Sequence, residues 1–169
     1  MNPRRAILLT PVFVLTPVIG LLFLIGCGPD PEQMKTEAQQ ALSVGDFSQA
    51  REISTRALEQ VPESEKRLTW SLERIRLEAL ARESQAAEAL ETLERLAAKY
   101  PEQAGASLYL AIASYLGDAG DSSGAIDILV AGDKRFPEES EKFEAQIREL
   151  QAGGLDPAEI ERLRSLGYL

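Results

Sequence analysis

Apolar residues recur every three or four positions along almost the whole chain beyond residue 30, and this period predicts a succession of amphipathic helices. The helices are predicted at residues 31–44, 47–61, 65–82, 85–99, 102–117, 121–135 and 138–152, with a last one from Pro157. No stretch alternates apolar and polar residues with the period of two that marks a half-buried strand. The protein is therefore predicted to be all-α.

The predicted helix 65–82 is apolar on two faces rather than one. One stripe consists of Leu68, Leu72, Ile75 and Ala79, and the other of Trp70, Leu77 and Leu80. A helix that is apolar on two sides is expected to be buried between neighbouring helices. We therefore expect this helix to lie in the middle of the array.

A short motif occurs three times with spacings of 39 and 36 residues. Ala50, Ala89 and Ala125 are each followed twelve residues later by a proline, and each is preceded five residues earlier by a turn. A proline cannot continue a helix, and a small alanine allows a second helix to approach closely. Periods of this length are typical of stacked helical hairpins, because one hairpin cannot bury its apolar face alone.

The turns of the three copies are not equivalent. The first and third read Gly45-Asp46 and Gly120-Asp121, in which glycine suits a left-handed residue and aspartate suits the N-cap of the next helix. The second copy reads Ser84-Gln85, which has neither feature. The second hairpin is therefore the most divergent of the three.

The repeated unit resembles the tetratricopeptide repeat over roughly residues 31–137. The third copy matches that pattern best, at Tyr109, Ile112, Ala113, Leu116, Gly120, Asp121, Ala125, Leu129, Phe136 and Pro137. The second copy has Leu96 where the pattern has a small residue, which leaves the angle of its helix pair open. The resemblance implies an α-solenoid of about three helical hairpins at residues 32–137.

Residues 138–169 are expected to cap the open end of the solenoid. Phe143, Ile147 and Leu150 share one face of a predicted helix. Asp156 and Glu159 have the spacing of a reciprocal capping box at the start of the last helix.

The N-terminus has the pattern of an export signal. Two arginines among the first five residues precede an uncharged run from residue 6 to residue 26, which is typical of a signal peptide. The run ends in Leu24-Ile25-Gly26-Cys27, which resembles the bacterial lipobox. That resemblance implies cleavage after residue 26, lipidation of Cys27 and a short tether at residues 27–31. Gly28, in place of an aspartate, implies the outer membrane, facing the periplasm. The alternative is an uncleaved transmembrane helix, for which the run is long enough.

Charge and composition argue against several classes of function. Without Arg4 and Arg5 the 18 basic residues become 16 against 27 acidic ones, so the body carries a net charge of −11. Nucleic acids and anionic lipids need a basic surface and are not expected partners. The chain contains no histidine, and its single cysteine is the one assigned to lipid. We therefore predict no enzymatic activity, no cofactor, no metal site and no small-molecule substrate.

Binding of a protein or peptide partner remains as the predicted function. In tetratricopeptide arrays the first helices of the repeats line a groove for an extended or helical peptide. Matched to that pattern, the groove residues are Lys35, Gln39, Trp70, Glu73, Leu77, Leu110 and Ser114. A shift of one residue in the second copy would bring in Arg74 and Glu78 instead. The prediction is a membrane-tethered scaffold that mediates protein–protein interactions in the bacterial cell envelope, in an assembly or biogenesis complex. The alternative is a structural or self-associating solenoid subunit of an envelope machine, held by an uncleaved N-terminal transmembrane helix.

Overall fold

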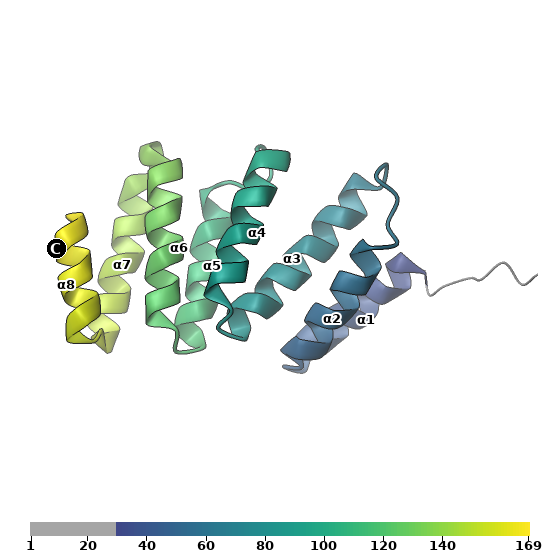
Figure 1. Ribbon diagram of the computed structural model, residues 1–169, viewed down its shortest axis with the longest axis horizontal. Helices are drawn as coiled ribbons and strands as arrows, with labels where there is room; N and C mark the ends of the chain where they lie inside the picture. The colour runs from purple at the N-terminus through teal and green to yellow at the C-terminus, as the bar shows by residue number, and fades with distance from the viewer. Residues whose placement is uncertain (1–29) are drawn as a thin grey trace, which may run out of the picture.

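The computed structural model describes residues 30–169 (Figure 1). This part of the chain contains eight α-helices and one 3-10 helix and no strand, which confirms the all-α prediction. The elements are α1 (Pro31–Ser43), α2 (Phe47–Leu58), α3 (Lys66–Arg82), α4 (Ala86–Lys99), α5 (Ala106–Asp118), α6 (Ser122–Arg135), η1 (Pro137–Glu139), α7 (Ser140–Gly154) and α8 (Pro157–Leu166).

Consecutive helices form hairpins that stack side by side into an open solenoid. In Figure 1 the second helices α2, α4 and α6 lie in front, α1, α5 and α7 lie behind them, and α3 crosses at a slant between α2 and α4. First helices contact first helices, α1 with α3, α3 with α5 and α5 with α7, and α4 contacts α6. The solenoid thus consists of three hairpins, α1–α2, α3–α4 and α5–α6, followed by the cap α7–α8.

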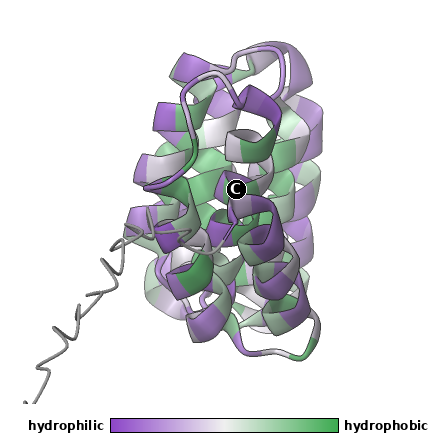
Figure 2. Ribbon diagram, turned by 90° about the vertical axis from the view of Figure 1, so that its right-hand side faces the viewer, coloured by the Kyte–Doolittle hydropathy of each residue, from purple (hydrophilic) through white to green (hydrophobic). Residues whose placement is uncertain are grey.

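Helix α3 divides the interior into two hydrophobic cores. The N-terminal core consists of Met34, Ala38, Ala41, Ala50, Ile53, Ala57, Leu68, Leu72, Ile75 and Ala79. The C-terminal core begins at Leu77, Leu80 and Ala81 on the other side of α3 and extends as far as Leu163 in α8. The two apolar stripes predicted for α3 therefore pack into different cores. In Figure 2 the hydrophobic stretches of ribbon face the interior between the helices.

The repeated alanines lie where the sequence predicts. Ala50, Ala89 and Ala125 are each completely buried. Gly45 and Gly120 adopt left-handed conformations with φ of +80° and +84° in the turns of the first and third hairpins. Ser84 takes the same place in the second hairpin with φ of +56°, a conformation that is costly for a residue with a side chain.

The middle hairpin differs from the other two where its helices meet. The repeat spacing aligns Leu77 with Ala38 and Ala113, and it aligns Leu96 with Ala57 and Gly132; all of these residues are buried. Two leucines thus occupy positions that small residues fill in the other hairpins. As a result α3 and α4 contact each other less extensively than α1 and α2 or α5 and α6 do.

A buried carboxylate joins the helices of this middle hairpin. The repeat spacing aligns Glu73 with Met34 and Tyr109 of the other two hairpins, and Glu73 is only 5% exposed. Its Oε1 lies 2.8 Å from Arg95 Nη1 on α4, and its Oε2 lies 3.7 Å from Arg76 Nη1 on α3. The hydrogen bond to Glu73 raises the pKa of Arg95. Ion pairs therefore replace part of the apolar packing between α3 and α4.

The last two helices cover the third hairpin as predicted. Phe143, Ile147 and Leu163 are buried in the C-terminal core, and Leu150 packs against it while partly exposed. The Phe143 ring lies so close to Gly132 that a Cβ added there would lie 2.4 Å from Phe143 Cε1. The cap is thus part of the same packed interior as α6.

Polar contacts hold the two ends of the cap. Asp156 and Glu159 form the predicted capping box at the start of α8, each side chain accepting from the backbone N–H of the other residue. After α8 the chain folds back on α6, because the Tyr168 hydroxyl donates to Asp133 Oδ2 at 2.5 Å. The Ser140 hydroxyl donates to the other oxygen of the same carboxylate.

Helix ends differ from the predictions by up to four residues. Helix α5 begins at Ala106 rather than 102, because the N–H groups of Gln103 and Ala104 donate to the Tyr100 carbonyl and form a turn. Helix α7 continues through Gly154, which was expected to lie beyond its end. None of the helices between residues 30 and 169 combines the length and apolar composition that a membrane crossing needs.

Candidate functional site

The first helices of successive hairpins form one face of the solenoid, here called the first-helix face. A hollow of about 320 Å³ lies on it between α1 and α3. Its lining consists of Gln39, Leu42, Trp70, Ser71, Arg74, Ile75 and Glu78. The indole of Trp70 packs edge-to-face against Tyr100, with the ring centroids 5.7 Å apart. The hollow combines an aromatic ring with one charge of each sign, so it can contact both apolar and polar groups.

A second hollow of about 280 Å³ continues this face between α5 and α7. It is lined by Ser114, Gly117, Asp118, Ser122, Gln146, Glu149, Leu150, Gly153 and Gly154. The Gln146 side-chain amide donates to the Leu110 carbonyl at 3.1 Å and joins α7 to α5. With Asp118 and Glu149 as its charged members, the second hollow is negative.

Along the row of first helices, Arg82 lies between the two hollows and links α3 to α5. Its guanidinium carbon stacks 4.4 Å from the centre of the Tyr115 ring, and its Nη1 lies 3.4 Å from Asp118 Oδ2. A guanidinium stacked on an aromatic ring while paired with a carboxylate holds both helices in register. The first-helix face is therefore a continuous surface across α3 and α5.

The structure brings together some of the groove residues predicted from the sequence and separates others. Gln39 and Trp70 line the first hollow, and Ser114 lines the second. Lys35 pairs with Glu32 on its own helix, and Leu110 is partly buried against the C-terminal core, so neither lines a hollow.

Glu73 and Leu77 do not lie on the first-helix face, and this part of the prediction is corrected. Leu77 is completely buried in the C-terminal core, and Glu73 is buried and paired with Arg95 on α4. Arg74 and Glu78 line the first hollow in their place, which is the register shifted by one residue. The divergent turn and the leucines of the middle repeat were the sequence signals of this shift. The lining residues of α7 had no such signal, because that helix was assigned only to capping.

The described residues show no arrangement suited to metal binding: residues 30–169 contain no cluster of three or more histidine, cysteine, aspartate or glutamate side chains placed to hold an ion. The predicted lipidation site Cys27 and the predicted signal peptide lie outside the described residues. The structure therefore describes the candidate binding face and not the predicted anchor.

Comparison of the chain with protein-family models, with curated proteins and with solved structures finds no match.

Proposed function

We propose that this chain is a tetratricopeptide-type lipoprotein that presents its first-helix face to a protein or peptide partner in the bacterial cell envelope. The observation that carries the proposal is the side-by-side arrangement of α1, α3, α5 and α7, with two hollows on the face that they form. A surface of this kind suits an extended or helical segment, because such a segment can contact several helices in succession.

The first hollow is the candidate anchor point for the partner. Trp70 is the only tryptophan of the chain, and its ring is partly exposed in the hollow beside Gln39 and Arg74. Tryptophan and arginine are the residue types that most often dominate binding energy at protein interfaces. The partner is expected to place an apolar side chain against Trp70 and polar groups against Arg74 and Glu78.

The membrane tether belongs to the proposal through the N-terminal sequence. The lipobox-like segment ending at Cys27 supports lipid attachment, and the short tether would hold α1 close to the membrane. Outer-membrane residence facing the periplasm rests on Gly28 by resemblance. Lipid attachment adds stable anchoring when two or more acyl chains are present.

Photocrosslinking in cells tests the binding face. A photoreactive residue is placed singly at Gln39, Arg74 or Ser114 on the first-helix face, and at the exposed Arg56 or Glu91 on second helices as controls. We expect one crosslinked partner from the first three positions and none from the controls. Crosslinks from the controls alone would contradict the proposed face. Crosslinks between two copies of this chain would favour the structural, self-associating solenoid.

The anchor is tested separately by labelling with a fatty-acid analogue and by the mass of the mature N-terminus. We expect label on the wild type and none on Cys27→Ser. A wild-type protein that takes no label and keeps residues 1–26 would contradict lipidation and favour the uncleaved helix.

A further inference from the structure

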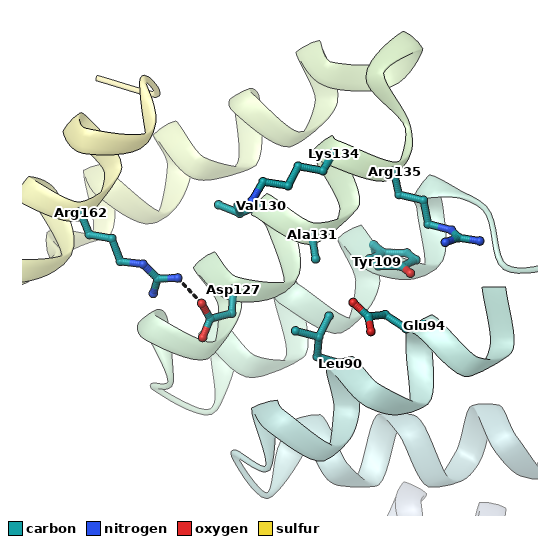
Figure 3. A pocket seen from close by; sticks show the side chains of 9 residues that line it. All are labelled: Leu90, Glu94, Tyr109, Asp127, Val130, Ala131, Lys134, Arg135 and Arg162. Atoms are coloured by element: carbon teal, nitrogen blue, oxygen red, sulfur yellow. Dashed lines mark hydrogen bonds and ion pairs between the residues drawn. The ribbon is translucent and has the colours of Figure 1, made fainter. Parts of the chain in front are cut away.

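A larger cleft lies among the second helices, away from the first-helix face. It has a volume of about 580 Å³ and is bounded by α4 and α6, with α8 at one edge (Figure 3). This volume falls within the range of small-molecule sites. The cleft, here called the second-helix cleft, has no part in the proposed function.

The lining of the second-helix cleft is positive in a protein whose body is strongly negative. Its charged members are Glu94, Asp127, Lys134, Arg135 and Arg162, which leaves one positive charge in excess. Arg162 pairs with Asp127 across the gap between α8 and α6. Lys134 and Arg135 form no ion pair with any residue between 30 and 169, so their charges remain available. The two hollows of the first-helix face, by contrast, carry charges of zero and −2.

Tyr109 contributes a hydroxyl that has no partner. This residue is 1% exposed, and its hydroxyl oxygen is a buried side-chain polar atom without a hydrogen bond within the described chain. Leaving a buried hydroxyl unpaired is costly, so such groups are rare and call for an explanation. The ring is held edge-to-face against Phe136 at 5.6 Å between centroids, which keeps the hydroxyl in place.

The hydroxyl lies between two opposite charges. In Figure 3 the Tyr109 oxygen is seen between the Arg135 side chain and the Glu94 carboxylate. Burial raises the pKa of Tyr109, Arg135 acts to lower it, and Glu94 acts to raise it. The hydroxyl therefore stays protonated at neutral pH and is a hydrogen-bond donor. Glu94 and Arg135 are themselves exposed and can rotate to admit a ligand.

These groups together select one kind of ligand. Two unpaired cations and a hydroxyl donor suit a hydrogen-bond acceptor that carries negative charge. Because the lining of the cleft has one positive charge in excess, the best match is an anion with a single negative charge. A carboxylate accepts hydrogen bonds from a guanidinium in a planar, two-pronged arrangement. Leu90, Val130 and Ala131 supply the apolar part of the lining. They can cover a short hydrocarbon body attached to the carboxylate.

We propose that the second-helix cleft binds a small organic monocarboxylate with a short apolar body. Arg135 and Lys134 pair with the carboxylate, the Tyr109 hydroxyl donates to it, and the hydrocarbon part lies against Leu90 and Val130. This ligand differs from the protein partner of the first-helix face, and it goes against the sequence-based prediction that the protein takes no small-molecule substrate.

The test uses hexanoate as the probe and hexanamide as its uncharged control, added to the full-length protein purified in detergent. Binding is followed by calorimetry and by NMR of ring-labelled tyrosine, of which the chain contains four. We expect hexanoate to shift the Tyr109 resonance and hexanamide to bind at least about tenfold more weakly, since the charge-assisted bonds are lost.

Three variants separate binding from folding. Arg135→Gln and Tyr109→Phe are each expected to weaken hexanoate about tenfold. Lys66→Gln, which removes a distant exposed charge at the start of α3, is expected to leave affinity unchanged. Tyr109→Phe should not lower the unfolding temperature, because the hydroxyl it removes has no partner. The proposal is overturned if hexanoate fails to shift Tyr109, if hexanamide binds equally well, or if Lys66→Gln weakens binding as much as Arg135→Gln.

Discussion

The middle hairpin and the third hairpin are built on the same repeat and held together differently. In α5–α6, Ala113 and Gly132 allow close approach of the helices, and the turn contains a left-handed glycine followed by a capping aspartate. In α3–α4, the equivalent positions hold Leu77 and Leu96, and the ion pair of Glu73 with Arg95 spans the two helices. The repeat pattern thus specifies a hairpin, while the size of the residues at the crossing determines how tightly it closes.

This difference also explains why α3 belongs to two cores. Because α3 and α4 contact each other less extensively, α3 packs with α1 and α2 on one side and with α5 on the other. The slant of α3 in Figure 1 follows from this double packing. The middle hairpin therefore connects two halves, whereas the third hairpin and the cap form one compact half.

Removing the cap should have the largest effect and should affect the third hairpin selectively. A chain ending at Ser140 loses Phe143, Ile147 and Leu163, each buried in the C-terminal core. At about 1.5–3 kcal/mol for each of these three side chains, the free energy of unfolding should fall by about 4.5–9 kcal/mol. Amide hydrogen exchange should show lost protection in α5 and α6, with α1 and α2 nearly unchanged. An equal loss of hydrogen-exchange protection in α1–α2 and in α5–α6 would contradict the division of the interior into two cores at α3.

Replacing Glu73 tests whether its ion pairs are needed to hold the middle hairpin. Glu73→Ala removes a buried partner of Arg95 and leaves a cavity, and should cost about 3 kcal/mol measured by urea unfolding. Glu73→Met introduces the residue found at the equivalent position of the first hairpin, Met34, and should cost less than Glu73→Ala, because it fills the cavity and the unpaired Arg95 side chain, 44% exposed, can turn toward water. A loss as large as that of Glu73→Ala would show that the ion pair itself is essential.

Adding one methyl group at Gly132 tests the close packing of the third hairpin. The new Cβ would overlap the Phe143 ring, which is fully buried and cannot move aside, so Gly132→Ala should cost about 1–3 kcal/mol in thermal unfolding. Gly153→Ala is the matched control, because a Cβ there meets nothing within 4 Å and should raise helix stability by about 0.5–1 kcal/mol. Similar effects at both glycines would mean that the third hairpin has more room than the structure shows.

The smallest expected effect concerns the turns. Ser84→Gly relieves a left-handed non-glycine residue and should stabilise the chain by about 0.5–1 kcal/mol, since the strain relieved exceeds the entropy that glycine adds to the unfolded state. The reciprocal change Gly120→Ser should destabilise by about 1 kcal/mol. Both are measured by chemical denaturation. If Ser84→Gly destabilises, local contacts of the serine outweigh its strain.

Much of the fold was predictable, because it depends on local pattern. Apolar periodicity and capping signals predicted the eight α-helices of residues 30–169, though not the short 3-10 helix η1, and the recurring alanines and prolines predicted the hairpins in which Ala50, Ala89 and Ala125 are buried. The candidate site was predictable only in part. Gln39, Trp70 and Ser114 lie in hollows, but Glu73 and Leu77 are buried because the middle hairpin does not follow the usual register.

The sequence by itself determined the helices, their order and the apolar faces, because these follow from short-range periodicity and from turn residues such as Gly45 and Asp46. Only the tertiary structure decided the slant of α3 and the inward position of Glu73, because both depend on how large side chains from separate helices share space. The tertiary structure also forms the second-helix cleft, which is lined by Tyr109, Arg135 and Arg162 from three different helices. The spacing of these residues in the sequence does not predict that they line one cleft, because each of them taken alone has the pattern of an ordinary core or surface residue.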